Sequence, residues 1–146
     1  MFQTIVFAYD GSAECRDAYE EGIELASRFH ARCYVLAVIR PQPEISFVEG
    51  RVSDEVLEQD RSELIAILKE GVRRMRQAGI DAAGHIQIDE EPTQAISAFA
   101  TEKDADLIII GHQRRSTLKG WWHGSVGHSL LDHAPCSVLV SMPMHH

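Results

Sequence analysis

Short apolar runs alternate along the chain with longer segments in which apolar residues recur every three or four positions. Runs rich in β-branched side chains are typical of buried strands, and the longer period is typical of helices with one buried face. We expect strands at residues 4–9, 33–39, 81–88, 106–111 and 137–142. We expect helices at residues 12–29 and 53–78, a short one from 92 onward, and a last one at 126–133.

Residues at the ends of these helices support their boundaries. Ser12 and Ser53 stand where an N-cap is needed, and Gly79 stands where the second helix should stop. Pro92 opens the third helix, where its missing N–H costs nothing. The expected buried faces are Cys15, Ala18, Gly22, Ala26 and Phe29, then Leu57, Leu64, Leu68, Val72 and Met75, then Ala95, Ile96, Phe99 and Ala100.

The regular alternation of strand and helix predicts an α/β fold over residues 1–146, in one domain. Right-handed crossovers then make the sheet parallel and open, with helices on both faces. Such sheets bind ligands beyond the carboxyl ends of their strands, where the strand order reverses. This rule directs attention to residues 8–12, to residues 38–40 and to the segment after residue 111.

Composition and charge limit the classes of partner that we expect this protein to bind. The chain has 146 residues and a formal net charge of −8, so nucleic acid is not expected to bind. The sequence contains no apolar run of membrane-spanning length and no signal peptide pattern, and we expect no membrane association. Three scattered cysteines do not suggest a disulfide framework, so a cytoplasmic location is expected. His145 and His146 are compatible with a native end or with a clipped tag and carry no argument.

One long segment of this acidic chain is basic. Residues 111–136, GHQRRSTLKGWWHGSVGHSLLDHAPC, contain no acidic side chain before Asp132. Gly124 and Ser125 precede the last predicted helix, and free N–H groups at a helix start bind anions. Arg114, together with Arg115 and Lys119, adds positive charge. The alternative is a surface loop whose glycines only turn the chain and whose basic side chains are solvated.

Several local stretches resemble the universal stress protein family. They are TIVFAYDGS at the start, LAV at the end of the second strand, DADLIIIG before the basic segment and GSVGHSLLDHAPCSVLV near the end. The resemblance covers essentially the whole chain, and it implies a five-stranded parallel sheet of order 3-2-1-4-5. In nucleotide-binding members, ATP lies across the ends of the first and fourth strands.

The resemblance also implies the adenine and ribose contacts. Ala8 and Tyr9 would line the adenine end, and the backbone of Val38 would meet the base. Asp10 corresponds to an acid that lies near the ribose or a nucleotide-bound Mg ion in such members. The simpler alternative for Asp10 is a turn with Gly11 before the first helix. No protein-held metal site is expected.

The phosphate motif of the family is G-x2-G-x9-G-[ST], and this chain departs from it once. Its frame runs from Gly111 through Arg114 to Gly124 and Ser125, so arginine replaces the middle glycine. A guanidinium is a good phosphate partner, and Arg114 would then help to hold the nucleotide. The alternative is that Arg114 fills the site and excludes it. The intact Gly124-Ser125-Val126 end favours retained binding.

Tryptophan and histidine residues in the same segment have weaker interpretations. Trp121 and Trp122 are expected to pack the segment onto the domain or to meet a partner, rather than to stack on adenine. His123, His128, Asp132 and His133 are more consistent with a solvated helix surface than with a metal site.

The sequence therefore predicts an adenine-nucleotide (ATP or AMP) binding stress-response protein that acts as a ligand-dependent switch, with Mg as a possible companion of the nucleotide. No base–nucleophile pair supports an efficient enzyme, so at most a slow ATPase is expected. The alternative is a nucleotide-free homodimeric interaction protein in which Arg114 occupies the phosphate site. In either case a homodimer through the apolar edge strand Ser137 to Met142 is expected.

Overall fold

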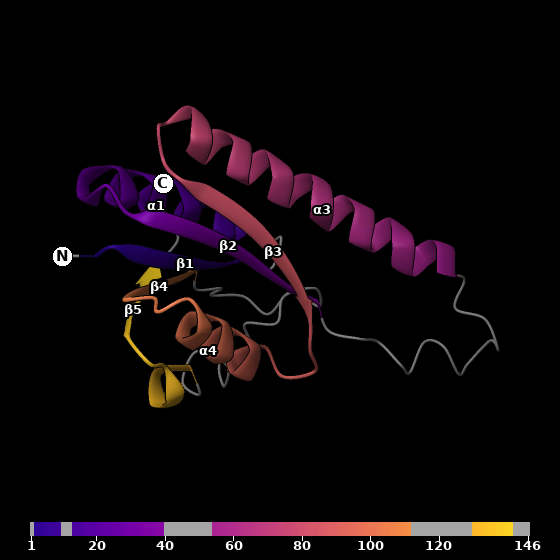
Figure 1. The fold of residues 1–146 in the computed structure, drawn as a ribbon. Helices are drawn as coiled ribbons and strands as arrows, with labels where there is room; N and C mark the ends of the chain where they lie inside the picture. Colours follow the sequence, from indigo (N-terminus) through magenta and orange to yellow (C-terminus); the bar gives the residue numbers. More distant parts are fainter. Residues whose placement is uncertain (1, 10–12, 40–53, 112–129, 142–146) are drawn as a thin grey trace.

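The computed structural model describes residues 2–9, 13–39, 54–111 and 130–141, without the side chains of residues 13–18, 39, 54–61 and 63. Its strands are β1 (Thr4–Tyr9), β2 (Arg32–Ile39), β3 (Ala82–Ile88), β4 (Leu107–Gly111) and β5 (Ser137–Ser141). All pairs are parallel, and the order across the sheet is β3-β2-β1-β4-β5 (Figure 1). Both the fold class and the strand order expected from the sequence are confirmed.

Helices cover the two faces of this sheet. The helices with printed bounds are α1 (Ala13–Phe29), α3 (Asp54–Gln77) and α4 (Pro92–Glu102), and residues 130–133 are also helical. In Figure 1, α1 and α3 lie on one face while α4 and the short helical stretch near the C-terminus lie on the other. No helix in the part of the chain that the structure describes is long and apolar enough to cross a membrane.

The end signals read from the sequence correspond to real helix ends. Pro92 occupies the first turn of α4, and Gly79, with a φ of 82°, follows the end of α3. A positive φ is costly for residues with a Cβ, so glycine is suited to this stop. The predicted caps at Ser12 and Ser53 lie outside the described residues.

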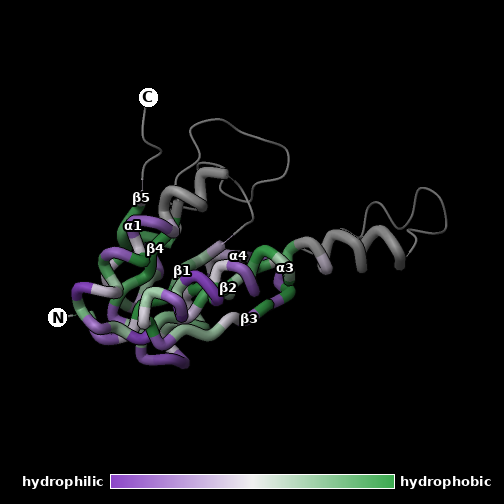
Figure 2. Tube along the Cα trace, turned by 90° about the horizontal axis from the view of Figure 1, so that it is seen from above, coloured by the Kyte–Doolittle hydropathy of each residue, from purple (hydrophilic) through white to green (hydrophobic). Residues whose placement is uncertain are grey.

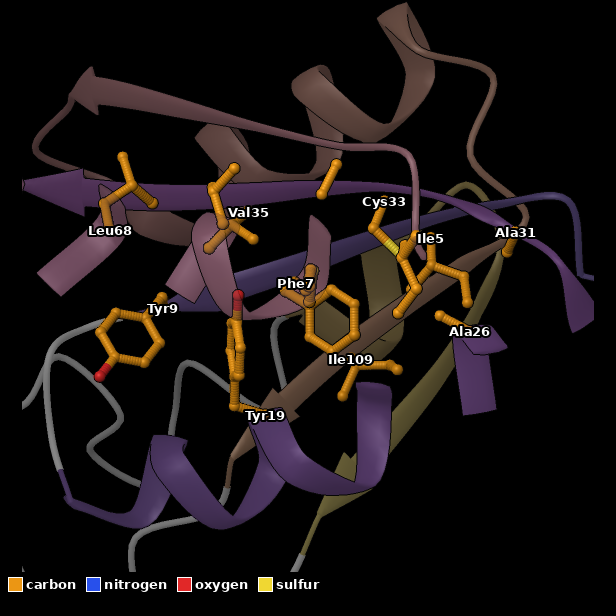
Figure 3. Packing of buried hydrophobic residues seen from close by; sticks show 14 of the residues in the cluster. Ile5, Phe7, Tyr9, Tyr19, Ala26, Ala31, Cys33, Val35, Leu68 and Ile109 are labelled. Carbon is orange, nitrogen blue, oxygen red and sulfur yellow. The ribbon is translucent and has the colours of Figure 1, made fainter. Parts of the chain in front are cut away.

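Alternate side chains of each central strand enter two separate cores. The first core lies under α1 and α3 and takes the odd residues of β1, such as Phe7 (Figure 3). The second lies under α4 and takes the even residues, such as Val6. In Figure 2 the hydrophobic colour gathers along the central strands, as expected for strands covered on both faces.

Most of the predicted helix faces are buried as expected. Leu68, Val72 and Met75 of α3 are buried, and so are all four apolar residues predicted for α4. Among the described members, Phe29 is the exception, since it is 39% exposed at the end of α1, with its ring edge-on to that of Phe2 at a centroid distance of 5.6 Å, and Leu64 is partly buried. The side chains of Cys15, Ala18 and Leu57 lie outside the described residues. The period of the apolar residues identifies the buried face of a helix, but not how deeply each residue on that face is buried.

Asp106 fixes β1 against β4 at the amino end of the sheet. Its carboxylate accepts hydrogen bonds from the backbone N–H groups of Gln3 (2.8 Å) and Thr4 (3.0 Å). Its own N–H donates to the carbonyl of Thr4 at 3.0 Å. Three hydrogen bonds from one residue align the two strands before their ladder begins, so Asp106 has a structural role that its place in DADLIIIG did not reveal.

Close packing of α1 on β1 depends on Gly22. A Cβ at this position would overlap the Cε1 and Cζ atoms of Phe7, whose ring is buried. Glycine normally weakens a helix interior, so its presence here reflects the short distance between helix and sheet.

We expect Gly22→Ala to destabilise the protein by about 2 kcal/mol, because overpacking of a buried ring outweighs the gain in helix propensity. Urea unfolding followed by circular dichroism measures the change. Ser27→Ala, at an exposed position of the same helix, is the control and should change stability by less than about 0.5 kcal/mol. A stabilised Gly22→Ala variant would contradict the close packing.

Two buried ionisable groups of the first core link stability to alkaline pH. Burial, followed by the nearby charge of Asp81, raises the pKa of Cys33 to about 12. Burial also raises the pKa of Tyr19 above its ordinary range. A raised pKa in the folded state contributes stability that is complete below the unfolded pKa and is lost as the pH rises above it. For Cys33 the loss begins at about pH 9.

We therefore expect the free energy of unfolding to fall steadily above about pH 9, where only the unfolded thiol ionises. Cys33→Ala should be less stable at neutral pH, because it leaves a cavity, yet should show a shallower decline at alkaline pH. Urea titrations over a pH series compare the slopes. Cys136→Ala, at a half-buried position, should keep a decline closer to that of the parent. Parallel declines in all three proteins would rule out Cys33 as the cause.

Candidate functional site

The sheet opens between the carboxyl ends of β1 and β4. Pairing of β1 with β2 continues to Tyr9 and Ala37, whereas its pairing with β4 stops at Phe7 and Ile109. Both strands nevertheless extend two residues further, to Tyr9 and Gly111. The chain also changes direction across the sheet at this point, since β2 lies on one side of β1 and β4 on the other. Parallel α/β sheets bind ligands in such a crevice.

Ala8 and Val38 lie on the same face near this opening. Both are buried members of the core beneath α4, and Ala8 pairs with Leu36, two residues before Val38. Their small apolar side chains give this face of the strand ends an uncharged floor. Because both side chains are already buried, a ligand here would meet mainly the backbone of the strand ends.

Tyr9 points to the opposite face. Its ring belongs to the core beneath α1 and α3 and meets the Tyr19 ring edge-on, with centroids 6.2 Å apart (Figure 3). The residues predicted to line the adenine end therefore separate, with Ala8 and Val38 on one face and the ring of Tyr9 on the other. Strict side-chain alternation in a strand explains this, since adjacent residues cannot face the same way.

Gly111 ends β4 beside the opening and pairs with Ser141, the last residue of β5. A glycine has no side chain that could hinder a ligand from approaching the backbone. The other predicted contacts, Asp10, Arg114, Gly124, Ser125 and Val126, lie outside the described residues, as do Trp121, Trp122, His123 and His128. Of the predicted contacts, the structure describes only Ala8, Tyr9, Val38 and Gly111, all of which lie on strands.

Sequence reasoning missed a polar contact at the same end of the sheet. The buried hydroxyl of Ser141 donates to the carboxylate of Glu21 on α1, at 2.9 Å. The two residues are 120 positions apart, and no local pattern connects them. This contact holds the end of β5 against α1 and puts a carboxylate on the α1 face.

Within the described ranges, no group of three histidine, cysteine, aspartate or glutamate side chains is placed to hold a metal ion. Asp132 and His133 are exposed there, at the end of the helical stretch. Asp10, the residue expected near a nucleotide-bound Mg ion, is not in these ranges.

Comparison with known proteins identifies the family. The family model described as "Universal stress protein family" matches residues 1–141. The chain is 29% identical to universal stress protein YxiE of Bacillus subtilis, covering 96% of this chain and 99% of that one. Among solved structures, a family protein of Burkholderia pseudomallei is 27% identical, with a TM-score of 0.77 and 96% of both chains covered.

A second solved relative carries a ligand. The universal stress protein of Archaeoglobus fulgidus in complex with dAMP is 26% identical to this chain, with a TM-score of 0.67, covering 95% of this chain and 97% of that one. The family model spans nearly the full length, and the strand order agrees with the one that the sequence resemblance implied. This chain belongs to the universal stress protein family.

Proposed function

We propose that this protein binds an adenine nucleotide in the opening between β1 and β4. The observation that carries the proposal is the early end of the β1–β4 ladder, which leaves the last two residues of each strand outside it. Neighbouring parallel strands whose ladder ends early leave a crevice in which a base and a ribose can meet the strand ends. The relative from Archaeoglobus fulgidus, solved with dAMP, supports this class of ligand.

The adenine would lie over the α4 face of the strand ends. The buried side chains of Ala8 and Val38 put no charge on this face, so the base would meet the strand backbone, and the backbone of Val38 would select it. Tyr9 would contribute its backbone, because its ring is committed to the opposite core. Asp10, the next residue, would reach the ribose or a Mg ion bound to the phosphates.

The phosphates would lie over the segment after β4. Gly111 allows close approach at its start, and Gly124, Ser125 and Val126 would supply N–H and hydroxyl donors at its end. Arg114 would pair with the phosphates. Binding across both ends would favour one arrangement of residues 112–123, and a partner that contacts this segment would detect the ligand. In this proposal the protein is a binding switch and not an enzyme.

Arg114 also motivates the competing proposal, a nucleotide-free interaction protein. A guanidinium that already occupies the phosphate position would exclude the nucleotide, and Trp121 and Trp122 would then meet a partner. The two proposals assign opposite effects to the same side chain, so one variant separates them.

We expect protein denatured immediately after purification to release adenine nucleotide, detected by chromatography. We also expect Arg114→Gly to weaken ATP binding about tenfold, as lost charged hydrogen bonds to phosphate would, while adenosine affinity stays unchanged. Calorimetric titration measures both affinities.

Glu102→Gln, an exposed carboxylate at the end of α4, is the control and should bind ATP like the parent. A tighter ATP complex of Arg114→Gly would support the nucleotide-free proposal instead. An empty parent protein that gains no thermal stability from millimolar Mg-ATP would overturn the binding proposal itself.

We further propose a homodimer through β5. This strand pairs only with β4 among the described strands, and its Val138, Leu139 and Val140 are only partly buried. An unprotected apolar edge of this kind is normally covered by a partner strand. Two-fold symmetry would pair the two β5 strands antiparallel, so the carboxyl end of one would lie beside the amino end of the other.

Val138→Lys should convert the dimer to a monomer of 16.3 kDa, because a buried ammonium in a strand-to-strand interface is costly. Light scattering after size exclusion gives the mass. Ile88→Lys introduces the same charge at an exposed position of the opposite edge strand and should leave the dimer intact. A parent protein that is monomeric at high concentration would overturn the dimer.

A further inference from the structure

A groove of about 870 Å³ lies between α3 and β3, at the opposite edge of the sheet from β5. In Figure 1, α3 runs above the edge strand β3, away from the opening between β1 and β4. The groove is lined by Ile65, Leu68, Lys69, Val72, Arg73, Arg76, Gln77, Gly84 and Ile86. It is therefore separate from the proposed nucleotide site.

The floor of the groove is apolar. Leu68 and Val72 are buried, and both lie so close to Gly84 that a Cβ there would come within 3.1 Å of each. Beyond Gly84 the strand is less covered, since Ile86 is 36% and Ile88 51% exposed on the same face. Large apolar side chains left open beside a groove mark a surface suited to a partner.

The rim of the groove is basic. Lys69, Arg73 and Arg76 line it, and none of the lining residues whose side chains the structure describes is acidic, although the chain has a formal charge of −8. Arg73 is oriented by Glu70, which does not line the groove, at 2.9 Å. Arg76 is oriented by the carbonyl of Ala82, at 3.0 Å. The occupant should therefore be anionic as well as partly apolar.

The edge of β3 offers backbone hydrogen bonds along this groove. β3 pairs with β2 throughout Ala82–Ile88, and no described strand lies on its other side. The strand contains neither a charged residue nor a proline, the usual means of protecting such an edge. An extended peptide can add to an edge of this kind, with main-chain bonds giving affinity and alternate side chains giving specificity.

The spacing of the basic side chains suits an extended peptide. Lys69 and Arg73 are four residues apart on α3, which is about 6 Å along a helix. Alternate residues of a strand are about 7 Å apart, so successive side chains on one face would meet successive basic residues. A glutamate in each such position would lay its methylenes over the apolar floor and its carboxylate on the rim.

We propose that this edge of the protein binds an extended acidic peptide, in which acidic residues alternate with β-branched ones, as a further strand beside β3. The acidic side chains would face α3, and the β-branched ones would face the α4 side of the sheet. A second copy of this chain fits poorly, since pairing two β3 edges would bring two basic rims together. This proposal does not depend on nucleotide binding.

The test uses a fluorescein-labelled heptapeptide of alternating glutamate and valine, with fluorescence anisotropy as the readout. A peptide with lysine in place of glutamate should not bind measurably. Arg73→Glu should weaken binding of the glutamate peptide about tenfold, because a rim attraction is replaced by a repulsion. Arg28→Glu is the matched control, since Arg28 is also exposed and paired with a glutamate on its own helix, and should retain the parent affinity.

Amide hydrogen exchange then locates the peptide. Bound peptide should slow exchange within residues 82–88, at amides that do not bond to β2. Equal affinity for both peptides, or equal affinity of Arg73→Glu and the parent, would overturn the proposal. Slowed exchange confined to α3, together with displacement of the peptide by decanoate, would overturn strand addition and indicate an anionic amphiphile instead.

Discussion

The position of β1 is the constraint on which the rest of this structure depends. Every residue from Ile5 to Tyr9 is buried, because helices cover both faces and strands pair with both edges. Asp106 sets its alignment with β4 at the amino end by binding two backbone N–H groups. Gly22 lets α1 approach it closely. With the amino end of β1 held in this way, its pairing with β2 and its pairing with β4 differ in length at the carboxyl end.

The unequal length of these two ladders connects the fold to the proposed function. The β1–β2 ladder continues to the last residue of β1, and the β1–β4 ladder does not. The same strand therefore belongs to a closed sheet on one side and to an opening on the other. The proposed nucleotide site uses this opening, and no separate pocket is needed to explain where the base would lie. Ser141 and Glu21 add order to the far side of the opening by joining β5 to α1.

The two edges of the sheet differ in what lies beside them. β5 has partly buried valine and leucine side chains, which suit an identical strand. β3 has a basic helix row above it, which suits an acidic strand and opposes an identical one. If both proposals hold, the sheet offers two strand-pairing surfaces with different selectivity, and the proposed nucleotide site lies between them. Neither edge strand is itself charged, so the difference in selectivity comes from the basic side chains of α3 beside β3.

Sequence alone determined the strands to within one residue, the parallel sheet, its strand order through the family resemblance, the stop of α3 at Gly79 and the start of α4 at Pro92. These features depend on local periodicity and backbone preference, which adjacent residues carry. Only the tertiary structure decided that the Tyr9 ring turns away from Ala8, that Phe29 stays exposed, and that Asp106 clamps β1. It also decided the Ser141–Glu21 contact and the groove beside β3. Each of these depends on groups far apart in the chain, whose distance and orientation are set by packing and not by sequence spacing.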